Sequence, residues 1–198
     1  MTELPELLVE DAAAWHAWLR RHHADHPGVW LVLQKKGGQT TALTYAEALD
    51  EALCFGWIDG QLRRRDEASY RQRFTPRRPT SAWSLHNVEN VARLSREGRM
   101  QPAGAAAVEA AKAQGRWQAA YPGQADMQVP PDLAQALAAE PAAAAAFEGL
   151  DAVNRYAIVY RLTTVKRAQT RERKLAEYVA MLARGESLHP RRRDPGGR

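Results

Sequence analysis

The side chains best suited to chemistry lie between residues 57 and 87. The stretch opens with Trp-Ile-Asp-Gly at residues 57–60 and closes with RFTPRRPTSAWSLHN at residues 73–87. Guanidinium groups beside a helix N-terminus suit phosphate or carboxylate, because both present N–H donors and positive charge. We therefore predict a ligand-binding face made of Trp57, Asp59, Gly60, Arg73, Phe74, Arg77, Ser81, Trp83, Ser84 and Asn87.

A purely structural interpretation of the same residues stays open. Ser81 could cap a helix and Trp83 could belong to the core, with the arginines solvated. The distinction depends on whether the side chains of Asp59, Arg73, Arg77 and Trp83 converge on one cavity.

We find no complete catalytic set and assign no catalytic residue. Cys54, the only cysteine, falls near a predicted helix C-terminus, where the helix dipole disfavours a thiolate. Asp50 and Glu51 are adjacent on that helix and so do not face each other. We expect Cys54 to be a packing residue and the two acids to be solvated or paired with arginines.

No metal or cofactor is predicted. His22, His23 and His26 are close in sequence, but no cysteine or carboxylate has ligand spacing relative to them. The run GGQT at residues 37–40 lacks the Gly-Lys-Ser/Thr pattern of a phosphate-binding loop, so we interpret it as a plain loop.

Composition indicates a globular protein. The chain has 198 residues, of which 45% are hydrophobic and 26% charged. Its first 15 residues contain no basic segment of a secretory signal, and no apolar run could span a bilayer. We predict a cytoplasmic location without membrane insertion.

The periodicity of apolar residues predicts an α+β fold. We expect a small antiparallel sheet of about three strands with flanking helices, followed by an all-helical C-terminal part. The expected strands are 29–36, 61–65 and 68–74, with 57–60 as a tight turn or the start of a hairpin. The expected helices are 11–23, 45–55, 80 or 81 to 97, 102–114, 132–139, 141–149, 151–160 and 164–184.

These elements predict three segments. Residues 1–115 form an α+β domain with the main motifs, residues 116–185 form a helical part, and residues 186–198 form a disordered basic tail. The net charge is +5, but residues 184–198 contribute five arginines and two acids, or +3, which leaves only +2 for the rest.

Nucleic-acid binding is a competing hypothesis, and an enzyme of unassigned reaction is another. Tyr70, Phe74 and Trp83 could stack on bases beside the arginines. Further positive charge would come from Arg161, Lys166, Arg167, Arg171, Arg173 and Lys174. No helix-turn-helix, zinc-finger or RNP pattern accompanies them, so we consider nucleic acid the weaker interpretation.

Several long runs resemble the bacterial YdeI/OmpD-associated family, often described as bacteriocin-protection proteins. They are TYAEALDEALCFGWIDG, RFTPRRPTSAWSLHNVENVARL, GRMQPAGAAAVEAAKAQGRW, VPPDLAQALAAEPAAAAAFEGL and KRAQTRERKLAEYVAML, and the resemblance covers about residues 15–185. It departs at Thr164-Val165-Lys166, where alanine would precede the lysine. The resemblance implies a role in envelope stress and bacteriocin tolerance, and it supplies no catalytic residue. We therefore expect a non-enzymatic stress protein that binds an anionic small molecule or a partner.

Overall fold

The computed structural model describes residues 3–123, 127–165 and 167–190, which belong to two compact units. Unit 1 comprises residues 1–121 and unit 2 comprises residues 122–198. Each unit has a hydrophobic core of its own.

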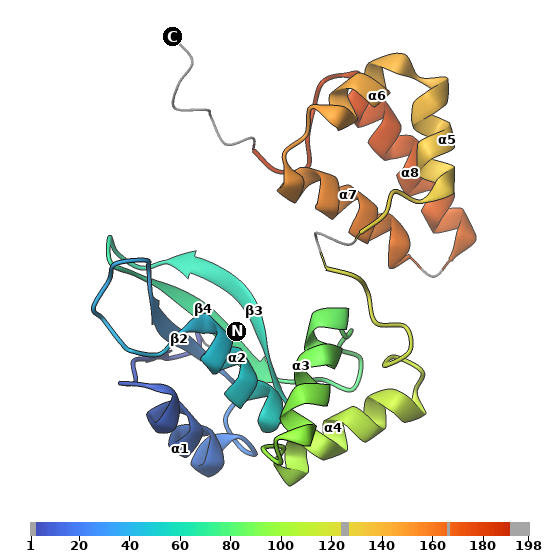
Figure 1. The fold of residues 1–198 in the computed structure, drawn as a ribbon. Helices are drawn as coiled ribbons and strands as arrows, with labels where there is room; N and C mark the ends of the chain where they lie inside the picture. The colour runs from blue at the N-terminus through green and yellow to red at the C-terminus, as the bar shows by residue number, and fades with distance from the viewer. Residues whose placement is uncertain (1–2, 124–126, 166, 191–198) are drawn as a thin grey trace. The chain divides into compact units, whose positions relative to one another are not determined.

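Unit 1 is built on a four-stranded sheet with the strand order β1-β2-β4-β3 (Figure 1). The strands are β1 (Glu6–Leu7), β2 (Val29–Gln34), β3 (Trp57–Arg64) and β4 (Ser69–Pro76). β1 runs parallel to β2, while β2–β4 and β3–β4 are antiparallel. The predicted α+β class is confirmed, but the sheet has four strands rather than three. The short β1 was missed because two residues carry no readable alternation.

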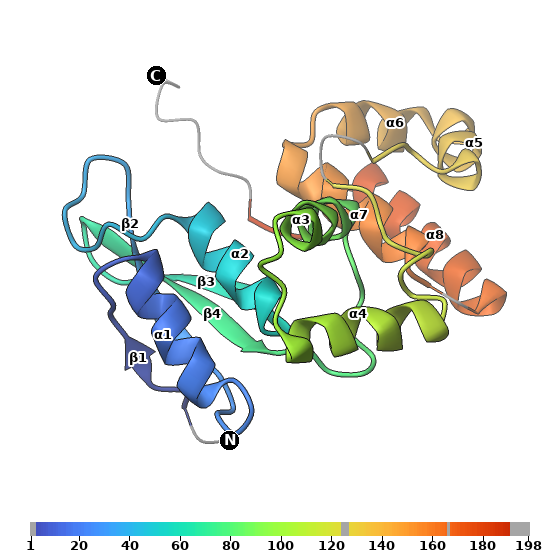
Figure 2. The same ribbon diagram turned by 60° about the horizontal axis from the view of Figure 1, so that its bottom comes forward.

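Four helices complete unit 1. They are α1 (Ala12–His22), α2 (Tyr45–Cys54), α3 (Leu85–Arg96) and α4 (Pro102–Ala113). α1 and α2 cover one face of the sheet, and α3 and α4 lie next to α2 (Figures 1 and 2). The core between α1, α2 and the sheet contains Trp15, Leu31, Leu53, Trp57 and Phe74.

Local sequence signals explain the ends of α2. The side chain of Thr44 accepts a hydrogen bond from the Glu47 N–H, and Glu47 accepts one from the Thr44 N–H, which confirms the capping box that this pattern predicts. Gly56 then adopts a φ of 75°, a left-handed conformation that favours glycine, and the chain turns into β3.

Of the two interpretations of residues 57–60, the tight turn was wrong. These residues begin β3, the first strand of a hairpin with β4, and the pairing of the two strands is interrupted by a bulge between Asp59 and Leu62. The predicted start of the next helix was also wrong. The following helix does not begin at Thr80 or Ser81. It begins at Leu85, because the Ser84 side chain accepts a hydrogen bond from the Asn87 N–H and serves as the N-cap.

Unit 2 is helical within the described residues. Its helices are α5 (Pro131–Ala139), α6 (Pro141–Glu148), α7 (Ala152–Thr163) and α8 (Ala168–Ala183). Pro131 and Pro141 occupy first helical turns, where a missing N–H costs nothing, and Asp151 caps α7 as predicted. Leu133, Phe147, Ile158, Leu162 and Leu182 form its core.

Within the described ranges, no helix has both the length and the apolar character needed to cross a membrane. Residues 191–198 of the predicted basic tail, and Lys166, lie outside the described residues.

Candidate functional site: an arginine-lined cavity

A cavity of about 580 Å³ opens where β4 ends and the chain turns toward α3. We call it the arginine cavity. Three arginines line it, two of them from the loop after β4. The lining residues are Pro27, Gly60, Arg73, Thr75, Pro76, Arg77, Arg78, Pro79 and Ser81.

The strand register assembles this cavity from distant parts of the chain. Val29 pairs with Phe74, so the turn before β2 lies beside the end of β4. Gly28 has a φ of 135°, and a Cβ atom there would be 2.6 Å from the Thr75 methyl group. Gly60 lies over the aliphatic stem of Arg73, where a Cβ would fit at 3.7 Å. The glycine at position 28 thus permits the close approach that forms one wall.

Arg77 is the most constrained of the three arginines. Its backbone N–H donates to the Gly56 carbonyl at 2.9 Å, and its Nη1 donates to the Ala82 carbonyl at 3.1 Å. Its guanidinium carbon lies 3.5 Å from the ring centroid of Trp83, a cation–π arrangement. Nε and Nη2 are buried and have no hydrogen-bond partner. Burial lowers the pKa of Arg77 to about 10, which still leaves the group charged at neutral pH.

The arginines of this cavity lack the carboxylate partners that other arginines have. Among the described residues, no carboxylate oxygen lies within 4.0 Å of a guanidinium nitrogen of Arg73, Arg77 or Arg78. The Nε of Arg73 is also buried without an acceptor. Nearer the β3–β4 turn, Arg65 and Arg71 both bind Glu6, at 2.8 and 3.4 Å. The cavity is therefore lined by positive charges that no carboxylate of the described residues neutralises at salt-bridge distance.

Asp59 is held to one side of this cluster. Its carboxylate accepts a hydrogen bond from the Tyr45 hydroxyl at 2.8 Å. Burial and the charge of Asp59 raise the pKa of the Tyr45 phenol. Asp59 acts on Arg77 only through the longer-range electrostatic field and does not form a salt bridge with it.

The structure separates the ten predicted site residues into groups. Four of them, Gly60, Arg73, Arg77 and Ser81, line the cavity, and Trp83 lies beneath Arg77. Ser84 caps α3. The others that lie apart from the cavity lining are Trp57, Asp59, Phe74 and Asn87.

Two of those residues are part of the core. Trp57 is 1% exposed, donates its Nε1–H to the His23 carbonyl and meets Trp15 edge to face. Phe74 is fully buried against Trp15. Asn87 is also buried, in the first turn of α3. These three side chains support the scaffold on which the cavity is formed.

Sequence reasoning missed several lining residues, namely Pro27, Thr75, Pro76, Arg78 and Pro79. Arg78 could have been included because it directly follows Arg77. Pro27 is 50 residues from Arg77 in the chain, and only the β2–β4 register brings the two together. No local pattern in the sequence contains that register.

Cys54 lacks the environment of a nucleophile. It is 1% exposed, and burial together with the nearby Glu51 raises the pKa of its thiol to about 12. Asp50 binds Arg93 with both carboxylate oxygens at 2.7 Å, and Glu51 binds Arg99 at 2.7 Å. These acids serve to join α2 to α3 and to the chain that follows α3.

The histidines near the end of α1 contact aromatic rings. His22 and His26 lie against Trp18 at centroid distances of 4.8 and 5.0 Å, and His23 lies against Phe55. In the part of the chain that the structure describes, no group of three or more His, Cys, Asp or Glu side chains could hold a metal ion.

The nucleic-acid hypothesis loses two of its three proposed stacking residues. Phe74 and Trp83 are 0% and 3% exposed, so neither presents a ring face to a base, while Tyr70 is half-buried. In unit 2, Arg171 pairs with Asp132 and Arg173 with Glu177.

Fold and site thus define a protein with an α+β unit that carries an arginine-lined cavity, and with a second, helical unit. A family model described as a domain of unknown function (DUF8412) matches residues 7–107, and the chain belongs to this family. The model described as "Bacteriocin-protection, YdeI or OmpD-Associated" matches residues 126–185. The resemblance to that family is thereby confirmed for the helical unit, whereas the motifs at residues 44–87 fall within the first model. No curated protein and no solved structure matches the chain.

Proposed function

We propose that this is a cytoplasmic bacterial stress protein of the bacteriocin-protection type, which binds an anionic small molecule, or an anionic group of a partner, in the arginine cavity. The observation that carries the proposal is that Arg73, Arg77 and Arg78 have no carboxylate partner among the described residues, whereas Arg63, Arg65 and Arg71 of the same unit pair with Glu3 or Glu6. The match of residues 126–185 to the bacteriocin-protection family supports the cellular role.

Energetics favour an anion over a neutral ligand. A buried donor without an acceptor costs about 1–3 kcal/mol, and more when the donor is charged. Arg77 has two such nitrogens and Arg73 has one. An anion in the cavity would accept hydrogen bonds from the guanidinium nitrogens that remain accessible, and its charge would offset the cost of burying the cations.

The site also holds its cation in place before a ligand arrives. The Arg77 guanidinium is fixed between the Trp83 ring and the Ala82 carbonyl. An immobilised side chain loses less entropy on binding, by about 0.5–1.5 kcal/mol for a rotamer-rich residue. The Trp83 ring itself is fixed by Trp117, at a centroid distance of 4.9 Å.

The binding test uses pyrophosphate as the probe and titration calorimetry on the full chain. The double variant Arg73→Gln/Arg77→Gln should weaken binding at least tenfold, because each charge-assisted hydrogen bond contributes about 1.5–3 kcal/mol. Arg20→Gln is the matched control: it removes one positive charge from an exposed position of α1, away from the cavity lining. Equal affinity in the double variant and the wild type would refute the site.

The cellular test asks whether the site serves the protective role. Cells that lack the protein would be complemented with wild type, with Arg20→Gln or with the double variant, and challenged with a bacteriocin. We expect the first two to restore survival and the double variant to fail at equal protein level. Full protection by the double variant would separate the cavity from the function.

A further inference from the structure

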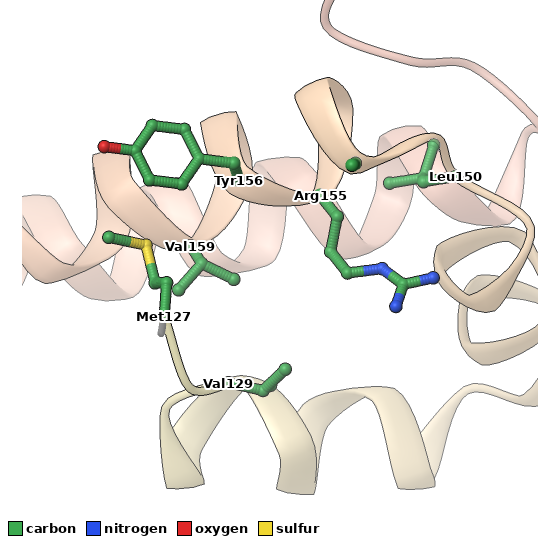
Figure 3. Close-up of a pocket in the computed structure, with 7 residues that line it drawn as sticks. Met127, Val129, Leu150, Arg155, Tyr156 and Val159 are labelled. Atoms are coloured by element: carbon green, nitrogen blue, oxygen red, sulfur yellow. The ribbon is translucent and has the colours of Figure 1, made fainter. Parts of the chain in front are cut away.

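Unit 2 contains a separate cavity of about 380 Å³ along the first two turns of α7. We call it the α7 cavity. Figure 3 shows Tyr156, Val159 and Met127 toward one end and Arg155 and Leu150 toward the other, with Val129 on the facing segment before α5. Its lining residues are Met127, Val129, Leu150, Ala152, Arg155, Tyr156 and Val159.

Five of the seven side chains that line this cavity are apolar, while Arg155, Tyr156 and backbone groups make slightly more than half of its accessible surface polar. Val129 is 38% exposed, so its side chain is accessible to a ligand. Val129 and Arg155 also line a second, mostly apolar cavity of about 410 Å³, whose other walls include Leu137, Ala144 and Phe147. Arg155 therefore lies where the α7 cavity meets a mostly apolar one.

Arg155 is positioned but not neutralised. Its Nη2 donates to the Glu148 carbonyl at 2.8 Å, and its guanidinium carbon lies 5.7 Å from the Phe147 ring centroid. In the described part of unit 2, no carboxylate oxygen lies within 4.0 Å of its guanidinium nitrogens, in contrast to Arg171, which binds Asp132. The remaining N–H groups of Arg155 are available to an external acceptor.

We infer that the α7 cavity binds a small amphipathic acid, with the carboxylate on Arg155 and an aliphatic chain or ring against Met127, Val129, Leu150 and Val159. Pockets that hold small molecules span about 300–1,000 Å³ and combine apolar walls with a few polar groups, which describes this cavity. Arginine is the side chain best matched to a carboxylate, because its two N–H groups can bind both oxygens. The site is independent of the arginine cavity and of its ligand.

A cationic or neutral ligand fits less well. A cation would meet the uncompensated charge of Arg155, and none of the seven lining residues is an acid. A neutral ligand would gain no charge-assisted hydrogen bond from the guanidinium, which is exposed. Tyr156 adds a hydroxyl at the opposite end, beside Tyr160, with which its ring stacks at a centroid distance of 5.6 Å.

The test uses octanoate as the probe and the methyl resonances of 13C-labelled methionine as the readout, on the full chain. Met127 lines the cavity, whereas Met181 packs on the core of the same unit and Met100 belongs to unit 1. Octanoate should shift the Met127 signal saturably and leave those of Met181 and Met100 in place. Octan-1-ol, which lacks the charge, should bind about tenfold or more weakly, the value of one charge-assisted hydrogen bond.

Variants of Arg155 separate the contribution of its charge to octanoate binding from that of its shape. Arg155→Gln should weaken octanoate about tenfold, and Arg155→Lys should retain part of the affinity. Arg161→Gln, an exposed arginine on the same helix that does not line the cavity, should bind as wild type does, and so should Arg73→Gln/Arg77→Gln. The inference is wrong if octanoate leaves Met127 unshifted, if Arg155→Gln binds equally well, or if octan-1-ol binds as tightly as octanoate.

Discussion

Both ends of the β3–β4 ribbon are rich in arginine, but among the described residues carboxylate partners are found only near the turn, for Arg63, Arg65 and Arg71 and not for Arg64. There, Arg65 binds Glu6 and Asp66, and Arg71 reaches Glu6. At the other end, Arg73 and Arg77 line a cavity without an acid at salt-bridge distance among the described residues. The short strand β1, which carries Glu6, accounts for the difference.

This contrast distinguishes structural arginines from candidate ligand-binding arginines. An exposed ion pair stabilises a fold by only about 0–1 kcal/mol, so the Glu6 pairs neutralise charge rather than hold the sheet together. Buried guanidinium nitrogens without an acceptor are destabilising; Arg71 also has one, but Arg71 has a carboxylate partner, whereas Arg73 and Arg77 have none among the described residues. A bound anion would supply the missing partner of Arg73 and Arg77.

The largest expected effect concerns the scaffold behind the arginine cavity. Gly104 of α4 packs so closely on α2 that a Cβ atom would overlap the Cys54 carbonyl. The same region fixes Arg77 through its N–H bond to Gly56. Gly104→Ala should lower the free energy of unfolding of unit 1 by about 3 kcal/mol, measured by denaturant titration of tryptophan fluorescence.

Gly149→Ala provides the control for that variant, and because unit 2 contains no tryptophan, its unfolding is followed by circular dichroism. Gly149 has a φ of −76°, and an added Cβ there would meet only ordinary contacts at 3.5 Å or more. We expect a change below about 1 kcal/mol. If Gly104→Ala lowered the free energy of unfolding no more than Gly149→Ala does, α4 would not pack on α2 as closely as the structure shows.

A smaller effect should follow from a change that keeps the charge of the cavity. Arg77→Lys retains the positive charge but loses the planar fork and the stacking on Trp83. Pyrophosphate affinity should fall about tenfold, less than in Arg73→Gln/Arg77→Gln. Calorimetry would show this, and an unchanged affinity would mean that charge alone, without the fixed guanidinium, accounts for binding.

At the other end of the ribbon, Glu6→Gln should have little effect. It removes the carboxylate from Arg65 and Arg71, which are partly solvated pairs. The free energy of unfolding should change by less than about 1 kcal/mol. A loss of several kcal/mol, or a strong change in pyrophosphate affinity, would contradict the division between the two ends.

The smallest expected effect is a pH dependence of the stability that the Asp132–Arg171 ion pair gives to unit 2. Hydrogen bonds from Arg171 lower the pKa of Asp132 below its usual value of 3.8. A depressed carboxyl pKa contributes stability above the unfolded-state pKa, and this contribution is lost as pH falls through the folded-state pKa. The pair is partly exposed, so Asp132→Asn should cost only a few tenths of a kcal/mol at neutral pH.

Acid unfolding provides the check on that pair. The difference between Asp132→Asn and wild type should vanish at a pH low enough to protonate the wild-type carboxyl as well. A difference that persisted unchanged at that pH would show that the hydrogen bonds of Asp132, and not its charge, account for the effect.

The sequence predicts those parts of the fold that depend on local interactions. The capping box at Thr44, the glycine stop at Gly56 and the N-cap at Asp151 all follow from short-range hydrogen bonds. The end of β4 at Pro76 also follows, because proline has no N–H for the ladder. Each of these features lies within four residues of its signal.

The parts that failed depend on distant partners. β1 exists only because Glu6 and Leu7 pair with Trp30 and Leu31. α3 starts later than predicted because residues 77–83 form a loop. The Arg77 guanidinium stacks on the Trp83 ring in this loop, and an isolated β-bridge joins Ser84 to Tyr121. The α7 cavity likewise needs the segment at Met127 and Val129 to face α7. A single sequence does not encode such pairings in readable form.

The most direct test compares the two ends of the ribbon in one sample. Two-dimensional 1H–15N spectra of arginine Nε–H groups would be recorded while pyrophosphate is added to the full chain. The Nε–H signals of Arg73 and Arg77, which have no acceptor, should shift saturably, while that of Arg65, which donates to Glu6, stays in place. Equal shifts at both ends, or none at Arg73 and Arg77, would contradict the assignment of the arginine cavity as the anion site.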